Sequence, residues 1–148
     1  MKTGQKGIEL IKSFEGCQLK AYLCSAGIPT IGWGNTFYED GRKVKIGDSI
    51  NQEMADDLLR NLLPKFEAIV NKNISVVLNQ NEFDALVSHT YNTGGSKTLF
   101  HLINNKASNI DIRNWFEKKY TTAKKNGVSV ELPGLVRRRK AEANLYFS

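Results

Sequence analysis

The spacing of apolar residues predicts a helix at the start of the chain. Ile8, Ile11 and Phe14 recur every three residues, which places them on one helix face. Glycine adopts the left-handed backbone cheaply, so Gly16 is expected to end this helix and to leave Glu15 in its last turn. There the negative end of the helix dipole disfavours the carboxylate form. A carboxylic acid that keeps its proton near neutrality can act as a general acid.

Between residues 20 and 46 the helical period is lost and short β-compatible runs take its place. Two of these runs are residues 30–36, Thr-Ile-Gly-Trp-Gly-Asn-Thr, and residues 43–46, Lys-Val-Lys-Ile, while residues 26–27 and 39–41 are typical of turns. The pattern predicts a small, irregular antiparallel sheet. A sheet of two or three strands is marginal alone and must pack on another element.

The helical spacing returns at residue 49 and continues to the end of the chain. Ser49 and Gln52 have the spacing of a capping box, and Pro64 interrupts the helix that they predict. Asn79 and Glu82 repeat the capping signature before the most apolar helix, which is expected to be central. Shorter helices are predicted up to residue 120, a polar connector over 121–132, and a last helix over 135–147. The predicted fold class is α+β, mainly α, in one domain over residues 1–148.

Composition places the chain among ordinary globular domains. It has 148 residues, of which 41% are hydrophobic and 24% charged. Its two cysteines do not make a disulfide scaffold, and neither they nor the two histidines have metal-site spacing, so no metal is expected. Glu9 and Lys12 interrupt the apolar positions of the first fourteen residues, so a secretory signal is not expected. The protein is therefore expected in the cytoplasm until another agent releases it.

The net charge of +6 is concentrated at one end of the chain. Residues 1–112 carry twelve basic and twelve acidic residues, whereas residues 113–148 carry nine basic and three acidic ones. Such a basic end favours contact with a polyanion, either nucleic acid, anionic lipid or an acidic cell-envelope polymer. The alternative is a solvated helix face with one arginine tied into the core. The run in question is Arg137, Arg138, Arg139 and Lys140.

A candidate site is formed by Glu15 and by two small polar residues that follow it, Cys24 and Thr30. The thiol and the hydroxyl could place a water opposite the acid, which is the minimum apparatus for hydrolysing an acetal. Cys24 could instead be a nucleophile of the Cys–His type. This is unfavourable because no histidine lies within fifty residues of it.

Flat and amide side chains near these residues are candidate substrate contacts. Tyr22 and Trp33 offer apolar faces suited to a sugar ring, and Gly34 clears space beside them. Tyr91 and Asn92, beyond the core face of the central helix, are candidate cleft-lining groups. The alternative interpretation is that Tyr91 is a core aromatic residue and that Asn92 belongs to the end of the helix.

The chain resembles the phage-type lysozymes of glycoside hydrolase family 24, also called endolysins or muramidases. Glu15, Cys24 and Thr30 match the triad pattern Glu-x8-(Asp/Cys)-x5-Thr of that family. Three further segments are similar to its signature segment, central helix and C-terminal helix, and together they span nearly the whole chain: residues 14–34, 79–94 and 134–142. The resemblance implies a lysozyme-like fold. Its β lobe would be inserted after the first helix, at about residues 1–48, and its larger helical lobe would occupy about 49–148.

The resemblance also implies an activity and a role for each residue of the triad. The enzyme would hydrolyse the β-1,4 bond between N-acetylmuramic acid and N-acetylglucosamine in peptidoglycan, without a cofactor, and so lyse the bacterial cell wall. Glu15 would be the general acid, and Cys24 and Thr30 would hold the attacking water. Most relatives have Asp in the middle position, and the interpretation here is that Cys24 positions water without bonding to sugar. A monomer is expected, reaching the wall through a holin lesion or from outside the cell.

Two other functions remain as alternatives. A lytic transglycosylase uses one acid and no water, and it leaves an anhydro sugar end. A basic nucleic-acid-binding module would use residues 113–148, but it gives no role to the triad, so no nucleic acid partner is expected. After export Cys17 and Cys24 could also pair and block the site.

Overall fold

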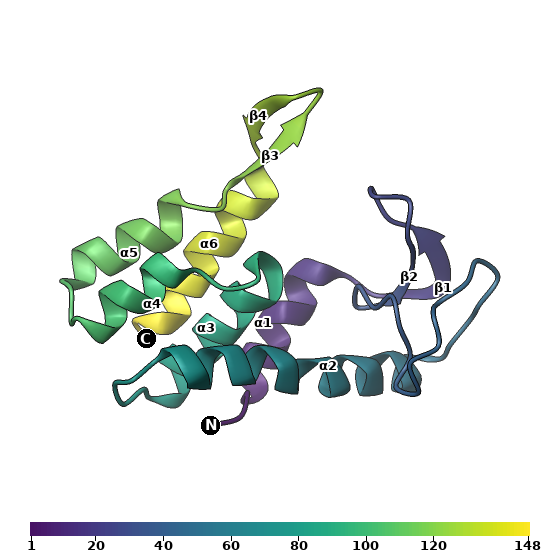
Figure 1. The fold of residues 1–148 in the computed structure, drawn as a ribbon, viewed down its shortest axis with the longest axis horizontal. Helices are drawn as coiled ribbons and strands as arrows, with labels where there is room; N and C mark the ends of the chain where they lie inside the picture. Colours follow the sequence, from purple (N-terminus) through teal and green to yellow (C-terminus); the bar gives the residue numbers. More distant parts are fainter. The chain divides into compact units, whose positions relative to one another are not determined.

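The computed structural model describes residues 1–148, which divide into two compact units. Unit 1 consists of Met1–Phe14 and Lys65–Ser148, and unit 2 consists of Glu15–Pro64. The order of elements along the chain is shown in Figure 1. One helix, α2 (Gln52–Asn73), contributes residues to both units because it continues past Pro64.

Most of the ordered elements are helices, and they confirm the predicted α+β, mainly α class. Gly16 has φ +66° directly after the first helix, as the sequence predicts. The helices other than α2 are α1 (Gln5–Glu15), α3 (Gln80–Thr93), α4 (Lys97–Asn104), α5 (Asn109–Lys118) and α6 (Pro133–Tyr146). None of the helices is long and apolar enough to cross a bilayer.

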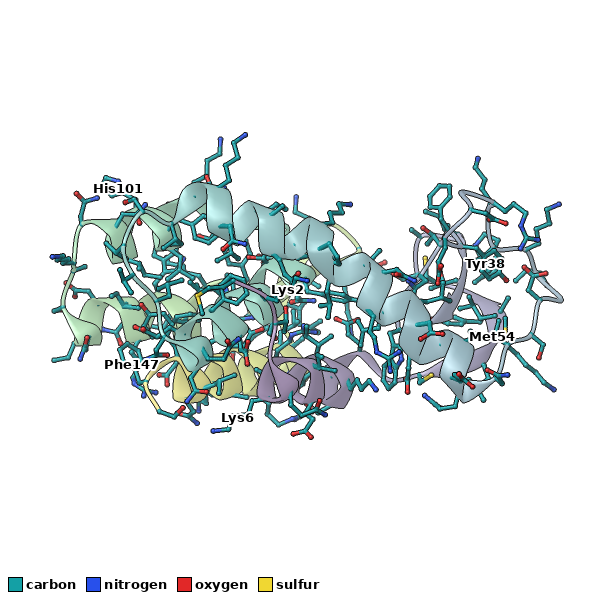
Figure 2. All side chains as sticks on the ribbon, turned by 90° about the horizontal axis from the view of Figure 1, so that it is seen from below. Lys2, Lys6, Tyr38, Met54, His101 and Phe147 are labelled. Atoms are coloured by element: carbon teal, nitrogen blue, oxygen red, sulfur yellow. The ribbon has the colours of Figure 1, made fainter.

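Helix α3 is the buried centre of unit 1. Its capping box is complete, because the Asn79 side chain accepts from the Glu82 N–H and the Glu82 carboxylate accepts from the Asn79 N–H. All residues from Phe83 to Thr90 are buried, and α3 packs against α6. His89 lies here in edge contact with the rings of Phe116 and Tyr120. His101, by contrast, is exposed on α4 (Figure 2).

Helix α6 brings an ion cluster into the core of unit 1. The guanidinium groups of Arg138 and Arg139 lie 3.3 Å and 2.7 Å from the carboxylate of Glu142, and both arginines are buried. Glu142 also accepts from the Ser88 hydroxyl at 2.6 Å. The prediction that Arg138 and Arg139 contact an anionic envelope is therefore wrong, because these charges are satisfied inside the protein. The alternative of arginines tied into the core holds, and Arg137 and Lys140 remain exposed.

Residues 121–132 form a β-hairpin, so the predicted polar connector is wrong. Strands β3 (Thr122–Lys125) and β4 (Val128–Glu131) pair antiparallel with Lys125 opposite Val128. Asn126 and Gly127 both have positive φ, at 52° and 79°, which is the backbone of a two-residue type I′ turn. The hairpin extends from the start of α6 (Figure 1). Almost all of its residues are exposed.

Unit 2 contains a second two-stranded sheet. Strands β1 (Gln18–Leu23) and β2 (Pro29–Gly32) pair antiparallel, with Tyr22 opposite Thr30 and an irregularity between Gln18 and Tyr22. The predicted β run over 43–46 makes only an isolated bridge, between Phe37 and Lys43. The core of the unit is apolar and includes Ile31, Val44, Ile50, Ala55, Leu58, Leu59 and Leu63.

The first half of α2 closes this core. The helix begins at Gln52, and its first turn is capped by Asn51, whose side chain accepts from the Met54 N–H at 2.8 Å. The predicted cap at Ser49 is therefore wrong by two residues. Ser49 instead forms a β-bridge with Lys20. Pro64 lies inside the helix and does not end it.

Candidate functional site

Glu15 is the last residue of α1 and the first residue of unit 2, and it is half-buried. Its Oε2 atom lies 3.7 Å from the position that a Cβ on Gly34 would occupy. Gly34 has φ +93°, a conformation that side chains other than glycine rarely adopt. The carboxylate therefore lies beside a stretch of backbone that carries no side chain.

The turn that contains Gly34 is held by its own hydrogen bonds. Ile31 and Asn35 exchange N–H···O=C bonds of 2.9 Å across it. The buried Asn35 side chain accepts from the Trp33 N–H at 3.3 Å and donates to the Leu58 carbonyl at 3.4 Å. These bonds fix the turn to α2, so the backbone beside Glu15 is a preorganised wall.

Cys24 begins the loop that joins β1 to β2. Its N–H donates to the Ile28 carbonyl at 3.0 Å, and its carbonyl accepts from the Gly27 N–H at 2.8 Å. The backbone N–H groups of Ile28 and then of Ala26 hydrogen-bond the sulfur, and the Thr30 hydroxyl adds to them, so the pKa of the Cys24 thiol is lowered. The loop therefore stabilises negative charge on the sulfur, and a thiolate is a better hydrogen-bond acceptor than a thiol.

Thr30 is buried, and its hydroxyl donates to the Ile28 carbonyl at 2.9 Å. A hydroxyl carries only one proton, so the oxygen of Thr30 can still accept a hydrogen bond. Thr30 also contributes to the lowered pKa of the Cys24 thiol.

The three predicted catalytic residues all belong to unit 2. Cys24 and Thr30 flank the β1–β2 loop, and Glu15 lies beside Gly34, four residues after Thr30 along the same strand and turn. An acid, a thiol and a hydroxyl are thus positioned by one short segment. Such a set can donate a proton and hold a water.

The two aromatic residues predicted to contact a sugar differ in exposure. Tyr22 is 40% exposed on β1, so its ring is open to a ligand. Trp33 is 8% exposed, and its Nε1–H donates to the Asp56 carboxylate at 3.1 Å. Trp33 is therefore mainly a core side chain that ties the turn to α2.

Tyr91 and Asn92 lie in the last turn of α3, in unit 1. Tyr91 is half-buried, with its ring 4.9 Å from that of Phe66. Asn92 is exposed, and its side-chain oxygen accepts from Arg139. The Arg139 contact fixes the orientation of the Asn92 amide.

Cys17 and Cys24 flank opposite ends of β1 and are both free thiols. The strand between them has six residues, which extend over about 20 Å. A disulfide requires Cα atoms within about 7 Å. The folded chain therefore does not form the pair that the sequence left open. Cys17 instead lies 3.8 Å from the Gln52 side-chain nitrogen, which donates to it.

Some groups of the site escape prediction from sequence. The N–H groups of Ala26 and Ile28 act on Cys24 through the backbone, so their side chains give no signal. The only hint is Gly27, whose φ of +75° allows the tight loop. Asn35 and Asp56, which hold the turn to α2, resemble ordinary surface polar residues in the sequence.

Comparison with known proteins identifies the family. The phage lysozyme family model matches residues 12–142. The endolysin of Acyrthosiphon pisum secondary endosymbiont phage 1 is 38% identical over 150 residues, covering 100% of this chain and 99% of the relative. Among solved structures, an endolysin from Escherichia coli O157:H7 phage FAHEc1 superposes with a TM-score of 0.88 at 39% identity, covering 99% of this chain and 93% of that one. The muramidase domain of SpmX from Asticaccaulis excentricus has a TM-score of 0.84 at 32% identity, covering 99% and 98%. The chain therefore belongs to the phage lysozyme family and is a peptidoglycan-hydrolysing enzyme.

Proposed function

We propose that the chain, as one catalytic domain over residues 1–148, hydrolyses the β-1,4 bond between N-acetylmuramic acid and N-acetylglucosamine. Glu15 protonates the leaving oxygen of the glycosidic bond, and Cys24 and Thr30 hold the attacking water. The observation that carries the proposal is the position of Glu15 beside the side-chain-free backbone at Gly34, on the turn that directly follows the strand of Thr30 and the loop of Cys24. The muramidase name of one structural neighbour supports the choice of bond.

The loop around Cys24 supports a role as water holder. Two backbone N–H groups and the Thr30 hydroxyl stabilise negative charge on the sulfur, and negative charge favours a hydrogen bond from water. With the Cys24 sulfur as acceptor, the water presents a lone pair to the sugar while the sulfur polarises its O–H bond. No bond between sulfur and sugar is required in this scheme.

The test is a turbidity assay on purified peptidoglycan with wild type and Glu15→Gln, followed by masses of the released products. Loss of a general acid is expected to lower the rate by about 10²- to 10⁴-fold while the melting temperature stays within the wild-type range. Robust clearing by the Gln variant would remove Glu15 from its role. A mass increment of one disaccharide on Cys24 during turnover would replace water holding by covalent catalysis.

The same product masses separate hydrolysis from transglycosylation. Hydrolysis leaves a reducing end, whereas a lytic transglycosylase leaves an anhydro end that is one water lighter. The paired thiol and hydroxyl favour hydrolysis, because a transglycosylase has no use for a bound water. Anhydro products as the main species would reverse this assignment.

Exposed cations in unit 1 support contact with an anionic envelope polymer on the way to the substrate. Arg137 and Lys140 on α6 are exposed, and so are four lysines at and before the β3–β4 hairpin, namely Lys118, Lys119, Lys124 and Lys125. Such charges are screened by salt. Lysis of whole cells is therefore expected to fall with ionic strength more steeply than hydrolysis of soluble fragments. If whole-cell lysis and fragment hydrolysis depended equally on salt, the proposed contact with the envelope polymer would be refuted. Release by a holin stays part of the proposal.

A further inference from the structure

A basic pocket of about 310 Å³ lies in unit 2, in the segment between β2 and α2. Its size is at the lower end of the range for small-ligand sites. Three cationic side chains and one carboxylate line it, together with an aromatic ring. The lining residues are Tyr38, Arg42, Lys43, Lys45 and Asp48.

Lys43 and Lys45 are presented on the outer side of this segment. Both are exposed, whereas Val44 between them is buried, as expected where alternate side chains face opposite ways. The backbone is held here by a bridge between Phe37 and Lys43. The Val44 N–H also donates to the Thr36 carbonyl at 3.0 Å. Neither lysine forms an ion pair with the protein, so both ammonium groups can serve a ligand.

Arg42 is oriented by two neighbours and still has donors to offer. Its guanidinium lies over the Tyr38 ring, 5.2 Å from the ring centroid, and its Nε donates to the Asp40 carboxylate at 2.6 Å. The two terminal amino groups donate to no protein acceptor. They can therefore form the paired hydrogen bonds that a guanidinium makes with a phosphate.

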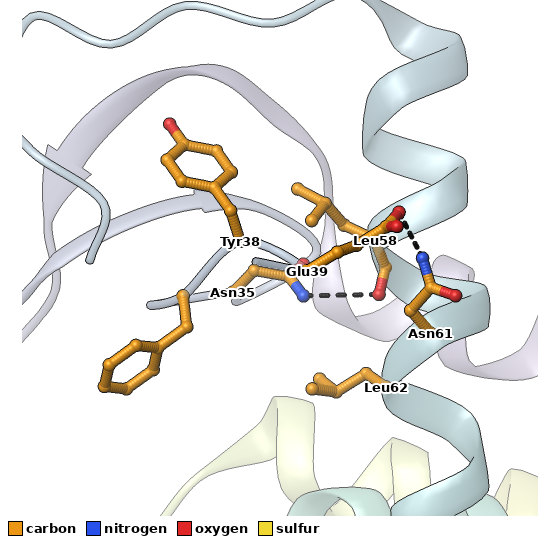
Figure 3. A pocket seen from close by; sticks show the side chains of 7 residues that line it. Asn35, Tyr38, Glu39, Leu58, Asn61 and Leu62 are labelled. Carbon is orange, nitrogen blue, oxygen red and sulfur yellow. Dashed lines mark hydrogen bonds between the residues drawn. The ribbon is translucent and has the colours of Figure 1, made fainter. Parts of the chain in front are cut away.

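Two acidic residues of the same segment lie outside the lining and have partners of their own. Asp40 accepts from the backbone N–H of Arg42 at 3.0 Å as well as from its Nε. Glu39 turns toward α2, where it accepts from Asn61, whereas Tyr38 points away from that helix (Figure 3). These carboxylates are therefore not directed into the basic pocket.

Asp48 is the one acid in the lining. The Tyr38 hydroxyl donates to it at 2.7 Å and the Lys45 N–H at 3.0 Å, and these two bonds lower the pKa of Asp48. Asp48 is thus ionised at neutral pH and offsets one of the three cations. The excess positive charge that remains matches a phosphate group, which carries about −1.5 to −2 at pH 7 and offers three acceptor oxygens.

We propose that this pocket binds a phosphate group, either free phosphate or a phosphate monoester at the end of a larger molecule. The terminal amino groups of Arg42 hold two of its oxygens, and the ammonium groups of Lys43 and Lys45 neutralise its charge. A carboxylate has a single charge and matches the lining less well. None of the candidate catalytic residues lines the pocket, so the site does not rest on the proposed function.

The test is an NMR titration of the ¹⁵N-labelled protein with inorganic phosphate at constant ionic strength, which keeps screening equal. Saturable shifts are expected for the backbone amides of residues 42–48. Replacing both lysines, as Lys43→Gln with Lys45→Gln, is expected to weaken binding about tenfold because two charged contacts are lost. Lys124→Gln with Lys125→Gln is the matched control, because it removes two exposed lysines of unit 1 and changes the net charge equally.

Asp48→Asn tests the charge balance in the opposite direction. The Asn oxygen can still accept from the Tyr38 hydroxyl, but the opposing charge is gone, so phosphate is expected to bind more tightly than to wild type. Weaker binding to this variant would contradict the proposed charge balance. Shifts that do not saturate, or an equal loss of affinity in both lysine pairs, would overturn the site.

Two further ligands define the chemistry that the pocket selects. Acetate at the same ionic strength is expected to bind more weakly than phosphate, and equal affinity would overturn the preference for phosphate. Glycerol 1-phosphate distinguishes the two sources of the ligand. Tighter binding of this ester than of inorganic phosphate assigns the pocket to a phosphate monoester, and the reverse order assigns it to the free ion.

Discussion

The two units treat their polar groups in opposite ways. Unit 1 buries Arg138, Arg139 and Glu142 together, so that both guanidinium groups contact the one carboxylate. Unit 2 keeps Glu15 and Cys24 half-exposed and gives Cys24 hydrogen bonds from backbone N–H groups. The difference indicates that polar groups in unit 1 mainly hold the fold, whereas those in unit 2 are available to a ligand.

The two units also differ in the backbone at their turns and helix ends. Side chains cap α3, α4 and α5 in unit 1, which favours regular helices. Unit 2 also caps α2 with Asn51, but it contains six of the nine glycines with positive φ, among them Gly27, Gly32 and Gly34 within the segment of the candidate site. Such turns let backbone groups approach a ligand closely. Changes in unit 1 should therefore act on stability, and changes in unit 2 on activity.

The largest effect on stability is expected from Glu142→Gln. The change removes the carboxylate charge that both buried guanidinium groups contact, and breaking such a buried ion pair typically costs about 3–5 kcal/mol. Chemical denaturation measures this loss. Glu9→Gln, at an exposed position of α1, is the control and should stay within about 0.5 kcal/mol. A Glu142→Gln variant as stable as the control would contradict the structural role of the cluster.

The next effect is a pH dependence of stability due to His89. Burial, reinforced by Arg139 and Arg138, lowers the pKa of His89 from 6.5 to about 3. As pH falls below 6.5, unfolded His89 takes up a proton that the folded chain does not accept until about pH 3. Proton binding stabilises the unfolded state, so the free energy of unfolding decreases by about 1.4 kcal/mol per pH unit well inside this window. Denaturation from pH 7 to pH 4 should show this slope, and His89→Gln should flatten it. An unchanged slope in the variant would assign the acid sensitivity to other groups.

In unit 2, changes at Cys24 should alter activity and leave stability nearly unchanged. Cys24→Asp is expected to keep most of the lytic rate because a carboxylate also accepts hydrogen bonds from water. Cys24→Ala should lose about tenfold, the loss expected when a water contact worth about 1.4 kcal/mol is removed. The measurement is the rate at which each variant clears purified peptidoglycan. Equal rates for the Ala and Asp variants would remove Cys24 from water holding.

Within unit 2, the two cysteines are expected to differ in reactivity. Because the pKa of Cys24 is lowered, iodoacetamide at neutral pH should alkylate Cys24 before Cys17, as peptide masses over time would show. Denatured protein is the control, since both thiols should then react alike. Faster labelling of Cys17 in the folded chain would contradict the role of the loop.

The smallest effect is expected at the N-terminal cap of α3. Asn79→Ala removes the acceptor of the Glu82 N–H and should lower the free energy of unfolding by about 1 kcal/mol. Activity well below the melting temperature should not change. Lost activity at full stability would show that unit 1 does more than hold the fold.

Local signals explain what could be predicted from the sequence. Gly16 ends the first helix and Asn79 with Glu82 begins the central one, because these residues act through their own backbone neighbours. The hairpin at Asn126 and Gly127 also has a local signal, the Asn-Gly pair, which the flanking lysines obscured. The turn signals at residues 26–27 also placed Cys24 and Thr30 on one short hairpin, because such a turn joins neighbouring strands.

Long-range packing explains the rest. Arg138 donates to the Ser88 carbonyl, fifty residues earlier, and Arg139 donates to Asn92, so no pattern within α6 separates these buried arginines from the exposed Arg137. The lowered pKa of Cys24 depends on the direction of two backbone N–H groups. The orientation of Glu39 away from the basic pocket depends on Asn61, more than twenty residues away on another element.

The β3–β4 hairpin has one more consequence, for behaviour at high concentration. Both of its strands are sheet edges whose outward backbone groups could recruit a second chain into a growing aggregate, and Val128 is 62% exposed there. Lys124 and Lys125 place positive charge along that edge and repel an approaching copy. Acetylating these lysines would remove the repulsion, so turbid, β-rich deposits should then form from protein whose core is still intact.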